Sequence, residues 1–313
     1  MGMVDIRDYL KQFSGKGPVY YCPNPGLAGD VLIGCVTFQL FRDLNIDFRL
    51  VDGRTFDAKD KVFFYGGGGN FIPPYRYAAE VISRVHHSAK KIVILPHTIF
   101  GNEALLKRLG NNVDIICREE NSYDHVRKFA AQAKVMLSHD MAFFLDTNKI
   151  LSPSGDSLGK AIRFELQYLF KKDKGDLSRS LELKQLTHFL KKEIVLFRTW
   201  KKGKTGILNC FRTDEEKTDI ELPHDNVDLP RILAYGREGE AIYERMACGI
   251  TNQFLRCLNR YVKIRTNRLH VAIAALLLGK EVELYKNSYY KNEAVYKYSI
   301  ENRFPRVRWI ANM

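Results

Sequence analysis

The stretch 261-YVKIRTNRLHVAIAALLLGKEVELY-285 decides the fold expected for this chain. Residues 261–266 alternate polar and apolar side chains and include β-branched residues, which is typical of a strand. The apolar run 269–278 is too short to span a bilayer and long enough for a buried helix. Asn267 is a good N-cap and Gly279 a good helix stop. Because a second strand follows Gly279, the stretch predicts one βαβ unit.

Arg268, Leu269 and His270 fall in the first turn of this predicted helix, at the carboxyl end of the preceding strand. Unpaired N–H groups and the positive end of the helix dipole favour an anion at such a position. An arginine and a histidine there indicate an anion site with a proton donor. A solvated arginine beside a buried core histidine is the alternative that the pattern alone leaves open.

Length, charge and cysteine content set broad limits on the protein. A chain of 313 residues is long for one core, so two domains are expected. The net charge of +13 favours anionic partners, namely phosphorylated substrates, nucleic acid or an anionic membrane face. Six cysteines without a CxxC pair predict buried free thiols and argue against a zinc site. Since neither a signal core nor a membrane-length apolar run is present, we expect a cytoplasmic protein, soluble or peripherally attached.

The first 150 residues alternate strand and helix patterns. Such an alternation predicts an α/β fold with a mostly parallel, doubly wound sheet, in which ligands bind at the carboxyl ends of the strands. The strands are expected at residues 18–22, 48–51, 61–65, 91–95, 113–117 and 135–137, and the helices at 5–13, 31–44, 74–87, 102–109 and 122–132.

Polar residues and glycines cluster at these predicted strand ends. Four glycines, 66–69, either let a ligand approach the backbone or form a mobile turn. No Lys-Ser/Thr pair follows them, which argues against a Walker phosphate loop. Helix capping is the alternative role for two carboxylates, at positions 30 and 119. The candidate site residues in this half are Asp30, Gly68, Asn70, His97, Glu119, His139 and Asp140.

The middle of the chain is strongly basic. Residues 148–159 predict a loop, and residues 160–204 carry 13 Lys and Arg against 5 Asp and Glu, a net charge of +8. Amphipathic helical patterns in this segment fit a surface that faces an anionic membrane or a lipid-diphosphate substrate. A solvated linker helix is the alternative.

The second half of the chain predicts another α/β unit. A strand is expected at 206–211, a helix at 240–259 before the opening βαβ unit, and a closing helix at 292–300. We therefore expect an N-terminal Rossmann-like domain over residues 1–159, a basic connector over 160–204 and a C-terminal Rossmann-like domain over 205–313, whose last helix packs back on the first domain.

Seven short motifs, in this order, resemble the polysaccharide pyruvyl transferase family. They span about residues 18–285, and the RLH element is the most specific, while residues 160–204 match none of them. The motifs are NPGLAGDVLIG, FYGGGGNF, ILPHTI, CREENS, LSHDMAFFL, CFRTDEE and IRTNRLHVAIAALLLGK.

The resemblance implies a GT-B-like arrangement of two Rossmann-like domains with the active site in the cleft between them. It implies transfer of pyruvate from phosphoenolpyruvate onto two hydroxyls of a sugar, which forms a cyclic ketal and releases phosphate. The acceptor would be a cell-surface polysaccharide, such as a capsule or exopolysaccharide, or its lipid-diphosphate-linked precursor at the inner face of the membrane. It implies no metal, no organic cofactor and no nucleic acid partner.

By resemblance, Arg212 and Arg268 bind the donor, Leu269 adds a backbone contact, and His270 is the acid that protonates the donor's methylene carbon. A helix N-terminus disfavours an imidazolium, so the expectation is that the multiply negative donor itself completes the acid. His97 stands where family members more often carry Gln before a Ser, so no family role is carried over to this position.

Two other functions fit parts of the sequence. The first is a GT-B glycosyltransferase that uses a nucleotide sugar, because an Arg and a His at a helix start also suit a diphosphate. The second is a non-catalytic α/β protein that binds RNA or an anionic membrane, which the charge suggests, although no aromatic-basic RNA motif is found. Phosphate release from phosphoenolpyruvate distinguishes the pyruvyl transferase from both.

Overall fold

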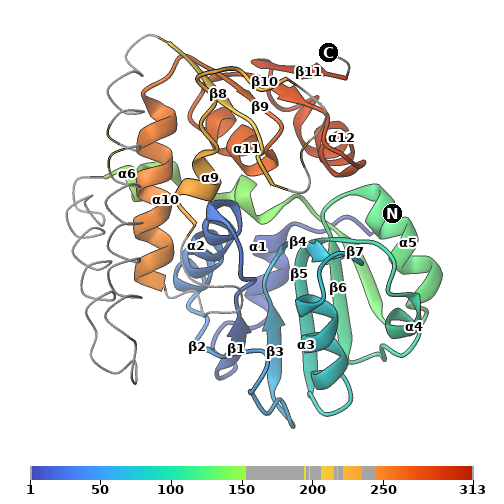
Figure 1. The fold of residues 1–313 in the computed structure, drawn as a ribbon. Helices are drawn as coiled ribbons and strands as arrows, with labels where there is room; N and C mark the ends of the chain where they lie inside the picture. Colours follow the sequence, from blue (N-terminus) through green and yellow to red (C-terminus); the bar gives the residue numbers. More distant parts are fainter. Residues whose placement is uncertain are drawn as a thin grey trace, which may run out of the picture.

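The structure is a computed structural model that describes residues 2–152, 194, 197, 206–214, 217, 221–234 and 244–311. These residues form two parallel sheets, one of seven strands and one of four. In Figure 1 the four-stranded C-terminal sheet, orange to red, lies above the seven-stranded N-terminal sheet, blue to green. The α/β class and the parallel sheets expected from the sequence are confirmed.

The N-terminal sheet has the strand order β2-β1-β3-β5-β6-β7, and β4 pairs with the end of β5. All of these pairs are parallel. The strands are β1 Val19–Cys22, β2 Phe48–Leu50, β3 Val62–Tyr65, β4 Gly68–Phe71, β5 Lys91–Ile99, β6 Val113–Cys117 and β7 Lys134–Leu137.

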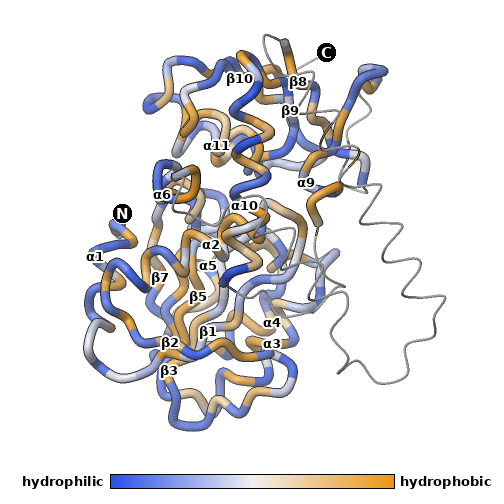
Figure 2. Tube along the Cα trace, turned by 90° about the vertical axis from the view of Figure 1, so that its left-hand side faces the viewer, coloured by the Kyte–Doolittle hydropathy of each residue, from blue (hydrophilic) through white to orange (hydrophobic). Residues whose placement is uncertain are grey.

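Helices cover both faces of this sheet because its central strands are apolar on both faces. Ile92 and Val93 are neighbours in β5, yet they belong to two different apolar clusters, as the two-residue period of a strand requires. Figure 2 shows the apolar residues of β5 and β7 in orange. The helices are α1 Ile6–Lys11 and α2 Ala28–Asp43 in one cluster, with α3 Tyr77–Val85, α4 Glu103–Leu106 and α5 Glu120–Phe129 in the other.

The C-terminal sheet has the order β11-β10-β9-β8, again with every pair parallel. Its centre is the predicted βαβ unit, and α11 ends before Gly279, whose φ of +72° favours glycine. The elements are β8 Ile207–Cys210, α9 Leu229–Ile232, α10 Glu244–Asn259, β9 Lys263–Thr266, α11 Leu269–Leu277, β10 Glu281–Tyr285, α12 Lys291–Val295 with a π turn Tyr296–Ile300, and β11 Val307–Ile310.

The local structure differs from the sequence patterns at four places. β5 continues through Pro96 to Ile99, with a register shift in its pairing with β6 before His97, so His97 and Thr98 lie inside the strand. The glycine-rich stretch, for which a mobile turn was one of two alternatives, continues into strand β4. Part of the expected loop at 148–159 is helix α6, Thr147–Leu151, and the chain after the last helix forms β11. Pairing with neighbouring strands stabilises β4, the end of β5 and β11. Local sequence patterns do not predict such pairing.

Several contacts join the two halves. Helix α10 packs along α2, where Cys35 Sγ lies 3.3 Å from Cys248 Sγ, and both are free thiols. His139 Nδ1, after β7, lies 2.9 Å from Ser299 Oγ in the π turn. The expected basic connector, 160–204, lies outside the described residues apart from Ile194 and Phe197, whose side chains are exposed.

Candidate active site

Arg212 and Arg268 follow the neighbouring strands β8 and β9 and are 8 % and 6 % exposed. They converge on the carboxylate of Asp214. Arg212 Nε and Nη2 donate to its two oxygens at 2.8 and 3.1 Å, and Arg268 Nη2 lies 2.8 Å from Oδ2. We call these residues, together with Asp228, the arginine site.

Asp228 holds Arg268 in place from the buried side. Its two oxygens accept from Arg268 Nε and Nη2 at 2.8 and 2.6 Å, and Oδ2 also accepts from the N–H and the hydroxyl of Thr213. The expectation that Asn267 caps α11 was wrong, since Arg268 occupies the cap position. Asn267 Oδ1 instead accepts from the backbone N–H of Arg212 at 2.8 Å, so it joins the two strand ends.

Asp214 keeps its negative charge at neutral pH. Burial disfavours the charged form of Asp214, but Arg212 and Arg268 outweigh that cost and lower the pKa of Asp214 to about 2. Two guanidinium groups therefore share the carboxylate of Asp214, with which an incoming anion would have to compete.

His270 lies in the first turn of α11 and faces the N-terminal sheet. Its side chain is 15 % exposed, and Nε2 lies 3.4 Å from Oδ2 of Asp140, which is 130 residues away in the chain. Nδ1 lies against Gly29 in the first turn of α2, where a Cβ would overlap it. The imidazole therefore occupies the junction between the two sheets.

Asp140 is fully buried and binds three partners. Arg118 Nη1 donates to Oδ2 at 2.6 Å, and the Ala142 N–H donates to Oδ1 at 2.8 Å at the start of the 3-10 turn η1, Met141–Phe144. Arg118 is itself buried and donates from Nε to Thr98 Oγ1 at 2.8 Å. Burial opposes ionisation of Asp140, but His270 and Arg118 outweigh it and hold the pKa of Asp140 well below its usual range.

At four glycines of the N-terminal motifs, a side chain of the protein itself occupies the space that a Cβ would take. A Cβ at Gly26 would meet the carboxylate of Asp30, and one at Gly69 would meet Nη2 of Arg118. A Cβ at Gly68 would meet the side-chain amide of Asn24 first and the carboxylate of Asp30 next. Together with Gly29, these glycines and the side chains they face form what we call the glycine rim. The missing side chains thus give functional groups room to approach the backbone.

Other predicted residues of the N-terminal half have local contacts. Asp30 Oδ1 accepts from Asn24 Nδ2 at 3.2 Å. His97 is buried, with Nδ1 3.2 Å from the Gly66 carbonyl and Nε2 3.1 Å from Asn70 Oδ1. Burial and Arg118 lower the pKa of His97 to about 3, so the ring is neutral and ties β5 to the glycine-rich stretch.

Glu119 and His139 also contact nearby groups. Glu119 caps α5 by accepting from the Ser122 N–H at 2.9 Å and from the Ser122 hydroxyl, and burial raises its pKa. Burial and, to a smaller degree, the positive charge of Arg303 lower the pKa of His139. Nδ1 of His139 faces Ser299. The groups that the structure brings to the junction are therefore His270, Asp140 and the glycine rim.

Sequence reasoning missed three participants: Asp214, Asp228 and Gly29. Asp214 stands two residues after Arg212 in the CFRTDEE motif, which was a usable signal. Asp228 lies 40 residues before Arg268 and has no local signal. Gly29 belongs to the NPGLAGDVLIG motif, but nothing in that motif indicates which side chain lies against it.

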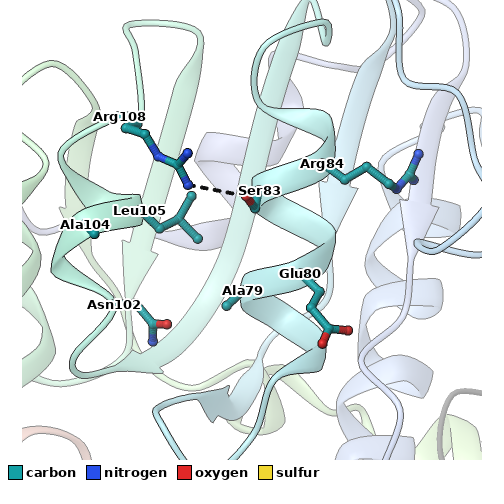
Figure 3. A pocket seen from close by; sticks show the side chains of 8 residues that line it. All are labelled: Ala79, Glu80, Ser83, Arg84, Asn102, Ala104, Leu105 and Arg108. Carbon is teal, nitrogen blue, oxygen red and sulfur yellow. Dashed lines mark hydrogen bonds between the residues drawn. The ribbon is translucent and has the colours of Figure 1, made fainter.

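A surface hollow lies elsewhere, between α3 and α4 (Figure 3). It is lined by Ala79, Glu80, Ser83, Arg84, Asn102, Ala104, Leu105 and Arg108, and none of these residues was predicted from the sequence to belong to a site.

Within the described ranges, no group of His, Cys, Asp and Glu is arranged to hold a metal ion. The described helices also include none with both the length and the apolar character needed to cross a bilayer.

Residues 28–282 match the family model described as polysaccharide pyruvyl transferase. The chain belongs to this family. A curated relative from Bacillus subtilis (strain 168), named "Putative pyruvyl transferase EpsO", is 27% identical over 298 residues, which is 88% of this chain and 84% of the relative. A crystal structure of a functional uncharacterized protein from Klebsiella pneumoniae subsp. pneumoniae NTUH-K2044 is 28% identical, with a TM-score of 0.72 over 98% of this chain and 97% of that one.

Membership of the pyruvyl transferase family agrees with the resemblance found in the sequence motifs. The matched range runs from α2 into β10 and so includes the arginine site and the glycine rim apart from its first glycine, Gly26, and Asn24.

Proposed function

We propose that this protein transfers pyruvate from phosphoenolpyruvate onto two hydroxyls of a sugar, forming a cyclic ketal and releasing phosphate. The proposal rests on one observation above all. Arg212 and Arg268 converge on a single carboxylate, and His270 stands two residues after Arg268. A small donor with a phosphate and a carboxylate needs cations that converge in this way.

In this proposal the donor's anionic groups replace Asp214 on the two guanidinium groups. Asp228 keeps Arg268 aligned throughout, because it is buried and bound to Thr213 as well. The N–H groups at the start of α11, beginning with Leu269, add to the positive field.

His270 would then donate its proton to the methylene carbon of the donor. The resulting oxocarbenium-like centre at C2 is attacked by one sugar hydroxyl, and the second hydroxyl displaces the phosphate. One hydroxyl proton restores the imidazolium and the other leaves with the phosphate, so the protons balance. A positioned acid of this kind contributes roughly 100-fold or more to the rate.

The glycine rim is the proposed acceptor side. Asp30 is only partly buried and has its carboxylate beside Gly68, so it is placed to bind sugar hydroxyls or to take a proton from one. We propose a GT-B-like arrangement in which residues 1–159 bind the acceptor and residues 205–313 bind the donor. A lipid-linked acceptor would place the enzyme at the inner face of a membrane.

The test is a phosphate-release assay with phosphoenolpyruvate and a panel of free and lipid-diphosphate-linked glycans. We expect phosphate release that depends on an acceptor, together with a product whose added carboxylate is acid-labile, as a ketal is. Absence of release with every acceptor, combined with absence of phosphoenolpyruvate binding in calorimetry, would refute the proposal. Release of a nucleoside diphosphate from a nucleotide sugar would instead support the glycosyltransferase alternative.

A further inference from the structure

We propose that Asp140, held by Arg118, is a positioning residue that orients the ring of His270 and provides the counter-ion for its imidazolium form before any donor binds. This inference rests on the proposed function, because it concerns the proposed acid. It replaces the expectation that the donor alone completes the acid with a carboxylate that the N-terminal half supplies.

The first support is the geometry around the imidazole. Asp140 is 0 % exposed, and its Oδ2 lies 3.4 Å from Nε2 of His270. On the other side of the ring, Nδ1 is confined by Gly29. A ring held between a carboxylate and a backbone has little freedom to rotate, and the carboxylate favours its charged form.

The second support is that Asp140 cannot easily give up its charge. It is paired with Arg118 at 2.6 Å and accepts from the Ala142 N–H, and its pKa is lowered accordingly. Oδ2 of Asp140 lies closer to Nη1 of Arg118, at 2.6 Å, than to Nε2 of His270, at 3.4 Å. Arg118 therefore holds the Asp140 carboxylate in place beside the imidazole.

The other charged groups near α11 do not duplicate this role. On α2, the next carboxylate is Asp30, which follows Gly29 and accepts from Asn24. On the same helix, Arg268 precedes His270 and is engaged by Asp228 and Asp214, and its positive charge disfavours an imidazolium.

The elements packed behind α11 direct their charges elsewhere. Lys263 and Arg265 on β9 pair with Glu283 on β10. On α10, Glu244 pairs with an arginine of α2, and Arg256 donates to Asn252. Asp140 is thus the carboxylate in contact with the imidazole.

The experiment compares Asp140→Asn with a matched control, Asp146→Asn. Both aspartates cap short helical turns, and Asp146 accepts from the N–H groups of Asn148 and Lys149 without touching His270. The measurements are the pH profile of kcat/KM for phosphoenolpyruvate and the NMR titration of the histidine ring protons, with the His270 signal assigned from a His270→Gln spectrum.

In Asp140→Asn, we expect the basic limb of the profile and the His270 titration to move down by about one pH unit or more. Activity at pH 8 should fall about tenfold, while phosphoenolpyruvate binding by calorimetry persists. Asp146→Asn should keep both curves in place. If both curves stayed where they are in the wild type, Asp140 would be only structural and the inference would be overturned.

The Asp140→Asn variant would leave the buried Arg118 without its charged partner, and a buried ion without its partner is strongly destabilising. If Asp140→Asn does not fold, Arg118→Gln combined with Asp140→Asn removes both charges and gives the same test. The two failures can be told apart. If the wild type does not act on phosphoenolpyruvate, the proposed function fails, and the NMR titration still decides whether Asp140 controls His270.

Discussion

The arginine site and the glycine rim hold their charged side chains in place by different means. In the arginine site, Arg212 and Arg268 are held by Asp214 and Asp228, which belong to the same half of the chain, so the charges balance locally. In the glycine rim, the positions of Asp30, Arg118 and His270 depend on glycines, because these three side chains occupy the space that a Cβ would otherwise fill. The comparison indicates that the first region can form from one half of the chain, whereas the second needs both halves in contact.

His270 fits against Gly29 in the glycine rim and stands two residues after Arg268 of the arginine site, so its replacement should have the largest effect. We expect His270→Gln to lower kcat at least about 100-fold, because glutamine cannot donate the proton. Phosphoenolpyruvate binding should persist, since the arginine site is unchanged. Turnover that stayed within about tenfold of the wild type in the phosphate-release assay would remove His270 as the acid.

Arg268→Lys tests the arginine site alone. A point charge replaces a planar fork that now bonds two oxygens of Asp228, and charged hydrogen bonds contribute about 1.5–3 kcal/mol each. We expect phosphoenolpyruvate affinity in calorimetry to fall roughly 10-fold to 100-fold. The control is Arg306→Lys, an exposed arginine of the same half that donates to the Gly279 carbonyl. Unchanged affinity in the Arg268 variant would exclude this residue from the donor site.

Gly29→Ala tests the glycine rim alone. The new methyl group would overlap Nδ1 of His270, so the ring should shift rather than the backbone. We expect kcat to fall about tenfold with unchanged donor affinity, as misplacement of a catalytic group by a fraction of an ångström does. Gly110→Ala is the matched control, because its nearest neighbour is the Asn112 side-chain oxygen at 3.2 Å. A donor affinity that fell instead would mean that the rim and the arginine site are one unit.

Asp214→Asn asks whether the internal carboxylate competes with the donor. Removal of its charge should tighten phosphoenolpyruvate binding several-fold, because a like-charged competitor leaves the two arginines. Competition calorimetry with inorganic phosphate would measure the same change. Weaker binding would show that Asp214 serves mainly to align Arg212 and Arg268.

The smallest expected effect is on acid stability. The folded pKa of Asp214, about 2, lies below its ordinary value of 3.8, so its stabilising contribution is present above about pH 4 and is lost as the pH falls toward 2. That contribution is at most about 2 kcal/mol. Denaturant unfolding at pH 4 and pH 2 should therefore show a smaller loss for Asp214→Asn than for the wild type. Equal losses would place the acid sensitivity in other groups.

Local patterns predicted much of the fold. The bounds expected for β6, 113–117, match the structure because a short apolar run between turn residues has few other solutions. The βαβ unit was predicted for the same reason, with Gly279 as its stop. Strands β4 and β11 were missed, because glycine-rich or half-exposed segments become strands only when a neighbouring strand offers hydrogen bonds.

The sequence by itself determined the chemical groups of the candidate site: two arginines after strands, a histidine in the first turn of a buried helix, and glycines before a helix. It also determined membership of the family, through the order of its motifs. Only the tertiary structure decided which groups meet. Asp140 and His270 are 130 residues apart, and they come into contact because α11 packs against α2 and η1. A burial pattern specifies that a helix face must be covered, but not which residue covers it.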